Sequence, residues 1–316
     1  MSARRTAYIS HPSSLAHEMG VGHPEQPARV SAIEDRLKAA WIFDFLEQHN
    51  AQPVTPEQLV RAHTQPYLDR LASAAPTEDG ALARVDPDTA MNRHTLEAAS
   101  RAAGAAVQAV DLVLGGSVGA AFCNVRPPGH HAEREQAMGF CFYNNVAVGA
   151  LHALEAHGLQ RVAVVDFDVH YGNGTADILG DDPRVLLCSS YQYPLYPLAG
   201  PARETASMSN VTLRAGDGGD AFREAVTASW FPALKRFAPE LILFSAGFDA
   251  HAEDPLAELR LVEDDYAWVT REILRRTRAS AGLRAVSTLE GGYDLSALGR
   301  AATVHIQALM EPDAGF

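Results

Sequence analysis

The sequence predicts an α/β fold in which a central, mostly parallel sheet carries helices on both faces. Short runs of apolar and β-branched residues, which are typical of strands buried on both sides, recur along the chain. Longer amphipathic segments with helical spacing lie between them. Because strands that alternate with helices form right-handed crossovers, we expect the strands to pair in parallel, with helices in two outer layers.

Changes in the hydrophobic pattern, together with glycines, bound the predicted elements. The predicted strands cover residues 7–10, 118–124, 161–167, 185–189, 240–245 and 285–289. The predicted helices cover residues 29–46, 56–71, 95–114, 144–157 and 294–310. Gly115 and Gly116 close the third of these helices, and Gly158 closes the fourth.

Length and composition are those of an ordinary globular protein. The chain has 316 residues, of which 47% are hydrophobic and 21% are charged. No Gly/Ser tract, Pro-rich stretch, long run of one charge or internal repeat interrupts it. We therefore expect residues 1–316 to form a single catalytic domain with a substantial core.

The charge balance bears on partners and location. The net charge is −13 at pH 7, whereas nucleic-acid binders normally carry a basic excess. An acidic surface suits basic partners such as lysine-rich peptides or polyamines, although solubility alone also accounts for it. The first residues resemble no secretory signal, and no window is apolar enough for a membrane span. Cys123, Cys141 and Cys188 are predicted to be reduced core residues, so the cytoplasm is the expected location.

Polar side chains follow several predicted strands at the point where each strand ends. The histidine pair 130–131 follows strand 118–124, and residues 166–170 include two aspartates and a histidine at the end of strand 161–167. Asp249 and Tyr293 follow the last two strands. Because ligands of open parallel sheets bind at the carboxyl ends of strands, we expect these side chains to surround one crevice.

Three of these side chains have the chemistry of a metal site. Asp168 and His170 are two residues apart, so on an extended strand end both point to the same face. Asp249 supplies a third ligand from another strand. Three protein ligands leave a position open for water or substrate, which is typical of catalytic zinc, although the same set accepts iron(II).

The remaining polar residues supply the other groups that a hydrolase needs. His130 and His131 are candidates for base and acid, and Tyr293 can donate its O–H to a developing oxyanion. Asp166 can orient a histidine. Each residue also has a purely structural interpretation, such as a cap for a helix near Asn173, a loop histidine or a packed aromatic ring. Their gathering at strand ends favours the functional interpretation.

Five segments resemble the signature blocks of the histone deacetylase family. They are RPPGHHA (126–132), GFCFYNNVA (139–147), DFDVHYGNGT (166–175), SAGFDAHAEDPLA (245–257) and EGGYD (290–294). The blocks occur in the family's order, and the similarity runs from HPEQPARVSAI (23–33) to the last predicted helix. Several long blocks in order are far more specific than one short motif.

The resemblance implies the three-layer arginase–deacetylase fold and assigns roles to the polar residues. Zinc would bind to Asp168, His170 and Asp249. His131 would be the general base and His130 its electrostatic partner, held by Asp166, while Tyr293 would polarise the scissile carbonyl. The family also carries structural potassium, which maps here to Asp166, Asp168, His170, Ser189 and Ser190, with a second site at Leu179, Asp182 and Val185.

The resemblance also implies a narrow substrate tunnel. Phe140 and Tyr196 would form its walls, with Tyr196 where many members have phenylalanine. Gly139 and Gly292 would let the backbone approach the substrate. Leu256 occupies the position at the tunnel mouth where polyamine-specialised members place a glutamate.

Two further positions bear on class within the family. The RPPGHH block, together with Asn173 where class I members have aspartate, resembles class II members. Tyr293 is a tyrosine rather than the histidine of weakly active class IIa members, so deacetylation is expected to be intact.

We therefore predict a zinc-dependent amide hydrolase that removes acyl groups, in the first place acetyl, from lysine side chains of proteins or peptides. An acetylpolyamine amidohydrolase is the first alternative, which the acidic charge favours and Leu256 disfavours. A protein that binds acyl-lysine without hydrolysing it would need neither Tyr293 nor paired histidines. An arginase-like enzyme would need a second ligand set, which is not found near residues 166–170 or 249–253. The predicted partners exclude nucleic acid and membrane, and a homo-oligomer is compatible with the sequence.

Overall fold

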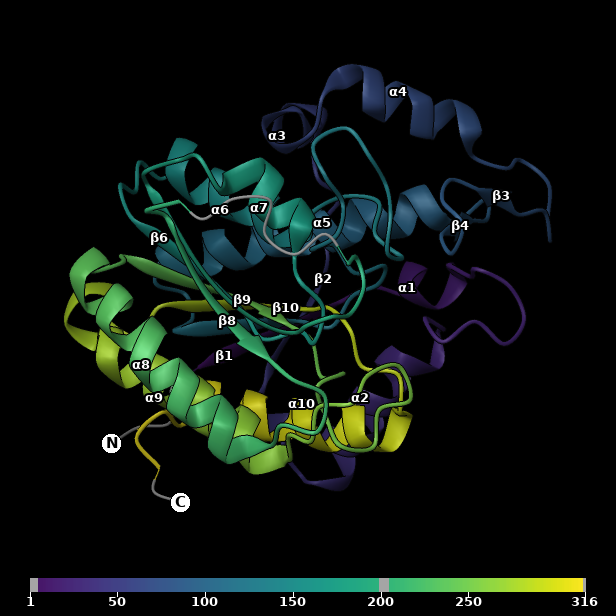
Figure 1. Ribbon diagram of the computed structural model, residues 1–316. Helices are drawn as coiled ribbons and strands as arrows, with labels where there is room; N and C mark the ends of the chain where they lie inside the picture. The colour runs from purple at the N-terminus through teal and green to yellow at the C-terminus, as the bar shows by residue number, and fades with distance from the viewer. Residues whose placement is uncertain (1–4, 199–204, 315–316) are drawn as a thin grey trace.

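The computed structural model describes residues 5–198 and 205–314, which are built around an eight-stranded sheet (Figure 1). The strands pair in the order β2–β1–β5–β10–β9–β6–β7–β8, and every neighbouring pair is parallel. Their bounds are β1 Thr6–Ser10, β2 Glu47–Asn50, β5 Ala120–Cys123, β6 Val162–Asp166, β7 Val185–Gln192, β8 Met208–Leu213, β9 Leu241–Ala246 and β10 Ala285–Leu289. Two short strands, β3 (Ala83–Arg84) and β4 (Ala90–Met91), form a separate antiparallel pair.

Helices cover both faces of the sheet (Figure 1). One face carries α5 (Thr95–Leu114), α6 (Asn145–Glu155) and α7 (Asn173–Leu179), with α1 (Ser13–Ala16), α3 (Pro56–Ala62) and α4 (Gln65–Ala74) on the same side. The other face carries α2 (Ala28–Ala39), α8 (Gly219–Phe237), α9 (Glu263–Ala281) and α10 (Leu295–Met310). The predicted three-layer α/β fold is therefore confirmed.

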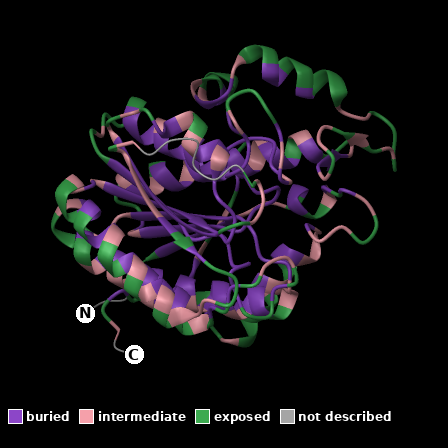
Figure 2. Cartoon of the chain, viewed as in Figure 1, coloured by how far each residue is buried: buried purple, intermediate pink, exposed green. Residues whose placement is uncertain are grey.

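Apolar side chains fill the space between the sheet and each helical layer. In Figure 2 the central strands are buried, whereas the outer faces of the helices are exposed. Trp230 and Phe244 belong to the layer beneath α8, α9 and α10, and Val110 and Leu243 belong to the layer beneath α5 and α6. Because successive strand residues point to opposite faces, neighbours such as Leu243 and Phe244 enter different layers.

The structure contains two edge strands that the sequence pattern did not predict. Strand β2 has the sequence EQHN and β8 has the sequence MSNVTL; among the described residues, β2 pairs only with β1 and β8 only with β7. An edge strand need not be apolar on both faces, so its sequence lacks the signal used for the central strands.

Two predicted helices are shorter than expected. The segment 56–71 is divided into α3 and α4 at His63 and Thr64, because Pro66 lacks an N–H group and lies in the first turn of α4. The segment 29–46 leaves the helix after Ala39, and Trp41 adopts a left-handed backbone conformation with φ of 59°.

The three cysteines are free and buried, as predicted. Among the helices of the described ranges, none combines the length and the apolarity needed to cross a membrane.

Close packing of a loop against α5 explains a glycine within this helix. A Cβ atom at Gly104 would overlap the carbonyl oxygen of Gln52 and would lie 2.6 Å from the backbone nitrogen of Val54. We expect Gly104→Ala to lower the free energy of unfolding by about 1–3 kcal/mol, although alanine is the better helix former. Urea denaturation measures this change, with Gly149→Ala as the control. A Cβ at Gly149 would meet its nearest neighbours, two side-chain atoms, at 3.2 Å and a backbone oxygen at 3.6 Å, so its effect should be smaller. An unchanged or raised stability of the Gly104 variant would contradict the packing.

Candidate active site

The carboxyl ends of four neighbouring strands bring the predicted site residues together. His130 and His131 follow β5, Tyr293 follows β10, Asp249 follows β9, and Asp166 is the last residue of β6. Strands β5, β10, β9 and β6 lie side by side in this order. Parallel pairing therefore places their loops at the same edge of the sheet, as in other open α/β sheets.

Asp168, His170 and Asp249 form a buried group of possible metal ligands. One ligand atom from each residue lies within 4.8 Å of the others. The Nδ1 atom of His170 is 3.0 Å from Asp168 Oδ1 and 3.2 Å from Asp249 Oδ2. Two carboxylates and one imidazole are a suitable donor set for zinc and also for iron(II).

The surroundings of this group fit a bound cation. The Oδ2 atom of Asp249 is buried and has no hydrogen-bond partner among the described residues. Backbone N–H groups orient the other oxygens, because Val169 donates to Asp249 Oδ1 at 2.9 Å and Gly291 donates to Asp168 Oδ2 at 2.8 Å. A side chain at Gly291 would overlap Asp249 Oδ2, so only glycine leaves these carboxylates free.

The two neighbouring histidines have different partners. His130 Nδ1 is 3.0 Å from Asp166 Oδ2, whereas His131 Nδ1 is 2.7 Å from Asn173 Oδ1. The Nδ2 group of Asn173 donates to Glu133 Oε1 at 2.7 Å, so its amide oxygen must face His131. His131 therefore carries hydrogen on Nδ1 and leaves Nε2 as a proton acceptor.

The electrostatic environment separates the two histidines further. Burial alone would lower the pKa of His130, but the carboxylates of Asp168 and Asp166 raise it well above the usual histidine range. Burial, together with the nearby His130 and His170, lowers the pKa of His131 well below that range. His130 is thus suited to carry a positive charge and His131 to remain neutral.

The backbone of Tyr293 is fixed by a buried carboxylate. Asp254 Oδ2 accepts from the Tyr293 N–H at 2.7 Å, and Asp254 Oδ1 accepts from the Leu256 N–H at 3.0 Å. The ring of Tyr293 packs edge-on against Phe140, with 5.9 Å between the ring centroids. Asp254 therefore joins the segment that carries Leu256 to the loop that carries Tyr293.

A cavity of about 200 Å³ opens onto this group. The predicted tunnel residues Phe140, Tyr196, Gly139 and Leu256 line it, together with His131, His170, Tyr293, Asp88 and Leu195. Asp88 and Leu195 were not predicted, because they lie in loops outside the recognisable sequence blocks. Gly292 is not among the lining residues. It turns the chain with φ of 121°, and a Cβ there would face Leu298 and Phe248.

The residues predicted to bind potassium form two groups, one at the ends of β6 and β7 and a second between α7 and β7. Asp166 is paired in register with Ser189, whose Oγ atom is buried without a hydrogen-bond partner among the described residues. Ser190 follows in the same strand. In the second group, the carbonyl oxygens of Leu179 and Asp182 accept backbone hydrogen bonds, and the Asp182 carboxylate is bound by Arg184.

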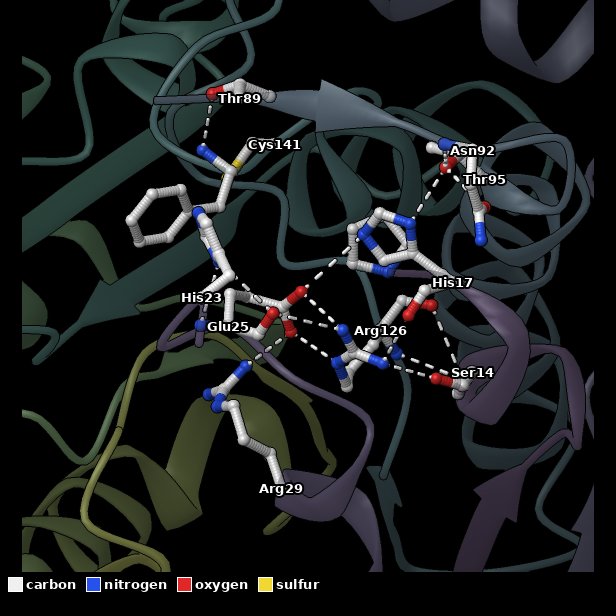
Figure 3. A network of polar contacts seen from close by, with 12 residues as sticks. Ser14, His17, His23, Glu25, Arg29, Thr89, Asn92, Thr95, Arg126 and Cys141 are labelled. Atoms are coloured by element: carbon white, nitrogen blue, oxygen red, sulfur yellow. Dashed lines mark hydrogen bonds and ion pairs between the residues drawn. The ribbon is translucent and has the colours of Figure 1, made fainter. Parts of the chain in front are cut away.

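Beneath the site, a buried carboxylate holds two arginines (Figure 3). Glu25 pairs with both nitrogens at one edge of the Arg126 guanidinium and lies 3.0 Å from Arg29 Nη1. Arg29 in turn donates to the carbonyl oxygens of Gly292, at 2.7 Å, and Glu290. The guanidinium of Arg29 also lies 4.9 Å from the ring centroid of Tyr293. One carboxylate thus supports the loops on both sides of the cavity.

The sequence did not predict this network of Glu25, Arg29 and Arg126. Glu25 and Arg29 are four residues apart, but the sequence gives no sign that both are fully buried or that Arg126 joins them. Burial alone would raise the pKa of Glu25, but Arg126, His17 and Arg29 hold it well below the usual carboxyl range. Glu25 is therefore ionised and compensated inside the protein.

Comparisons with known proteins agree with this geometry. The model of the histone deacetylase domain matches residues 23–309. The histone deacetylase-like amidohydrolase of Pseudomonas aeruginosa is 37% identical, over 92% of this chain and 82% of its own length. The human polyamine deacetylase HDAC10 is 32% identical, over 96% of this chain and 48% of its own length. The crystal structure of the HDA15 HD domain superposes with a TM-score of 0.91 at 32% identity, over 99% of this chain and 91% of that one.

The fold and the site thus define a hydrolase that acts on amides. The chain belongs to the histone deacetylase family, and the resemblance read from its sequence blocks is confirmed.

The Glu25 network should contribute strongly to stability. We expect Glu25→Gln to lower the free energy of unfolding by about 3–5 kcal/mol, because it leaves Arg126 and Arg29 buried without their counter-charge. Chemical denaturation measures this effect, and Glu97→Gln is the matched control. Glu97 forms an exposed pair with Arg101 at 2.9 Å, so its loss should cost less than about 1 kcal/mol. Equal effects of the two changes would contradict the role of the network.

Proposed function

We propose that this protein is a zinc-dependent hydrolase that removes acyl groups, in the first place acetyl, from lysine side chains of proteins or peptides. The proposal rests on one cavity at which a group of metal ligands, a histidine that can act as a base and a tyrosine hydroxyl come together. His170 of the buried ligand group Asp168–His170–Asp249 lines this cavity together with His131 and Tyr293. Each supplies a function that amide hydrolysis needs.

Asp168, His170 and Asp249 would hold the zinc ion. The orphaned Oδ2 atom of Asp249 and the donor set support this assignment, and iron(II) is also compatible with it. When bound, zinc polarises a carbonyl and lowers the pKa of a coordinated water towards neutrality.

His131 would act as the general base. Its Nδ1 hydrogen is committed to Asn173, so Nε2 is free to accept the proton that water loses on attacking the carbonyl. His130, held by Asp166, would remain protonated beside it and stabilise negative charge. The proton taken up by His131 would then pass to the leaving amine.

Tyr293 would donate its O–H group to the carbonyl oxygen of the substrate. Asp254 fixes its backbone, and Phe140 and Arg29 pack against its ring, so the side chain is held in place before substrate arrives. A preorganised donor of this kind stabilises the negative charge that develops on the oxygen during attack.

The cavity walls suit the aliphatic part of an acyl-lysine side chain. Phe140, Tyr196 and Leu256 present largely apolar surfaces, and Tyr196 also packs against His131 with 5.1 Å between ring centroids. A narrow apolar passage can hold the methylene chain of lysine while its acyl group reaches the buried ligands.

Several other assignments accompany this proposal. We infer structural potassium at Asp166, Asp168, His170, Ser189 and Ser190, supported by the Ser189 hydroxyl, which has no hydrogen-bond partner within residues 5–198 and 205–314. We infer a second potassium site at Leu179, Asp182 and Val185. We also infer that residues 1–316 act as a single catalytic domain in the cytoplasm.

An acetylated polyamine is the second candidate substrate. The net charge of −13 and the similarity to a protein named polyamine deacetylase favour it. Leu256 at the cavity disfavours it, because an apolar side chain there cannot pair with a second ammonium group.

Substitutions in the site separate the proposed roles. We expect His131→Ala to lower kcat by about 10²–10⁴-fold and Tyr293→Phe to lower it by about 10²–10³-fold. Turnover of an acetyl-lysine peptide is measured together with zinc content, which should stay unchanged in both. Tyr143→Phe, which alters a buried tyrosine that does not line the cavity, serves as the control. Near-wild-type turnover in either site variant would contradict its assigned role.

The substrate class is tested by direct competition. A fluorogenic acetyl-lysine peptide should be hydrolysed efficiently by the zinc-loaded protein, and acetylspermidine should compete weakly. Rapid cleavage of acetylspermidine without peptide hydrolysis would instead place the polyamine first. Binding of the peptide without turnover of either substrate would support the remaining alternative, a non-catalytic acyl-lysine binding protein.

A further inference from the structure

A second cluster of metal-binding side chains lies away from the active-site cavity. Asp111 belongs to α5, His152 lies in the last turn of α6, and His157 follows that helix. The Nε2 atoms of His152 and His157 lie 2.8 Å and 2.7 Å from the same atom, Asp111 Oδ1. None of the three residues lines the catalytic cavity.

We propose that Asp111, His152 and His157 bind a divalent transition-metal ion, with zinc as the ion that their two imidazoles and one carboxylate suit best. This site is separate from the proposed catalytic function and does not depend on it.

The spacing of the three donors supports the proposal. Their ligand atoms all lie within 4.8 Å of one another, as do those of Asp168, His170 and Asp249. Zinc binds imidazole nitrogen at about 2.0–2.1 Å and carboxylate oxygen at about 2.0–2.2 Å. Small side-chain shifts therefore allow both Nε2 atoms and the carboxylate to reach a single ion.

Local backbone structure explains how two histidines come to share one carboxylate. Helix α6 ends at Glu155, and Gly158 then adopts a left-handed conformation with φ of 71°. His157 lies between the helix end and Gly158, and its ring packs edge-on against that of His152 with 5.4 Å between the ring centroids. Because α5 packs against α6, Asp111 meets both rings.

Burial is graded across the cluster. The side chain of His152 is 9% exposed, that of His157 is 28% exposed and that of Asp111 is 52% exposed. An ion can therefore enter from solvent and keep water in its remaining coordination positions. Since the ligands come from two helices and the loop after α6, the bound ion would fasten the end of α6 to α5.

A nearby arginine should oppose metal binding. Arg61 Nη1 lies 3.3 Å from His152 Nδ1, so the arginine donates to this nitrogen when the nitrogen carries no hydrogen. Coordination through Nε2 requires the hydrogen of a neutral ring to sit on Nδ1, and the guanidinium must then move away. Replacing Arg61 should therefore strengthen binding of the ion.

Zinc stoichiometry tests the proposal. The full chain is dialysed to equilibrium against zinc with a weak competing chelator, and bound zinc is measured by mass spectrometry. We expect about two ions per chain in the wild type and about one in His157→Ala, which removes one of the three ligands. His94→Ala changes an exposed histidine outside the cluster and should keep both ions.

Further readouts make the outcome independent of catalysis. Arg61→Gln should keep both ions and bind the second about tenfold more tightly, in the range seen when groups around metal ligands are altered. Peptide turnover by His157→Ala should equal that of the wild type. The same number of bound ions in the wild type and in His157→Ala would overturn the proposal. A single ion in the wild type that is lost in His157→Ala would instead contradict the proposed catalytic zinc site.

Discussion

Two buried carboxylates placed against one imidazole are the constraint on which the rest of the site depends. Asp168 and Asp249 are fully enclosed at the carboxyl edge of the sheet, and burying like charges together is costly unless a cation or hydrogen bonds compensate them. Backbone N–H groups satisfy part of this need, but Asp249 Oδ2 has no hydrogen-bond partner among the described residues. A metal ion would supply the missing positive charge, and the glycine at position 291 leaves room for it.

Buried charged residues around this group of ligands hold the loops that carry the other site residues. Glu290 accepts from the backbone N–H groups of Gly129 and His130, which fixes the loop that carries the histidine pair. Below that loop, Glu25 compensates two buried arginines, one of which holds the carbonyl oxygens of the loop bearing Tyr293. The groups that would contact substrate are therefore positioned by partners whose own charges are already satisfied.

Much of this arrangement could be predicted from the sequence, because strand ends in a parallel sheet are set by local pattern. The match of the predicted strand 285–289 with β10 and the meeting of Asp168, His170 and Asp249 follow from that rule. What could not be predicted depends on contacts between distant segments. Asp88 reaches the cavity from a loop without a motif, and Arg126 pairs with a glutamate about a hundred residues earlier. Local periodicity carries no information on either contact.

We propose that amide hydrolysis at this cavity depends on a metal held by Asp168, His170 and Asp249. The most direct measurement is turnover of an acetyl-lysine peptide by the protein after removal of metal, and again after stoichiometric zinc is restored. We expect turnover to disappear when the metal is removed and to return with zinc, while circular dichroism shows that the fold is unchanged. Undiminished turnover by folded, metal-free protein would contradict it.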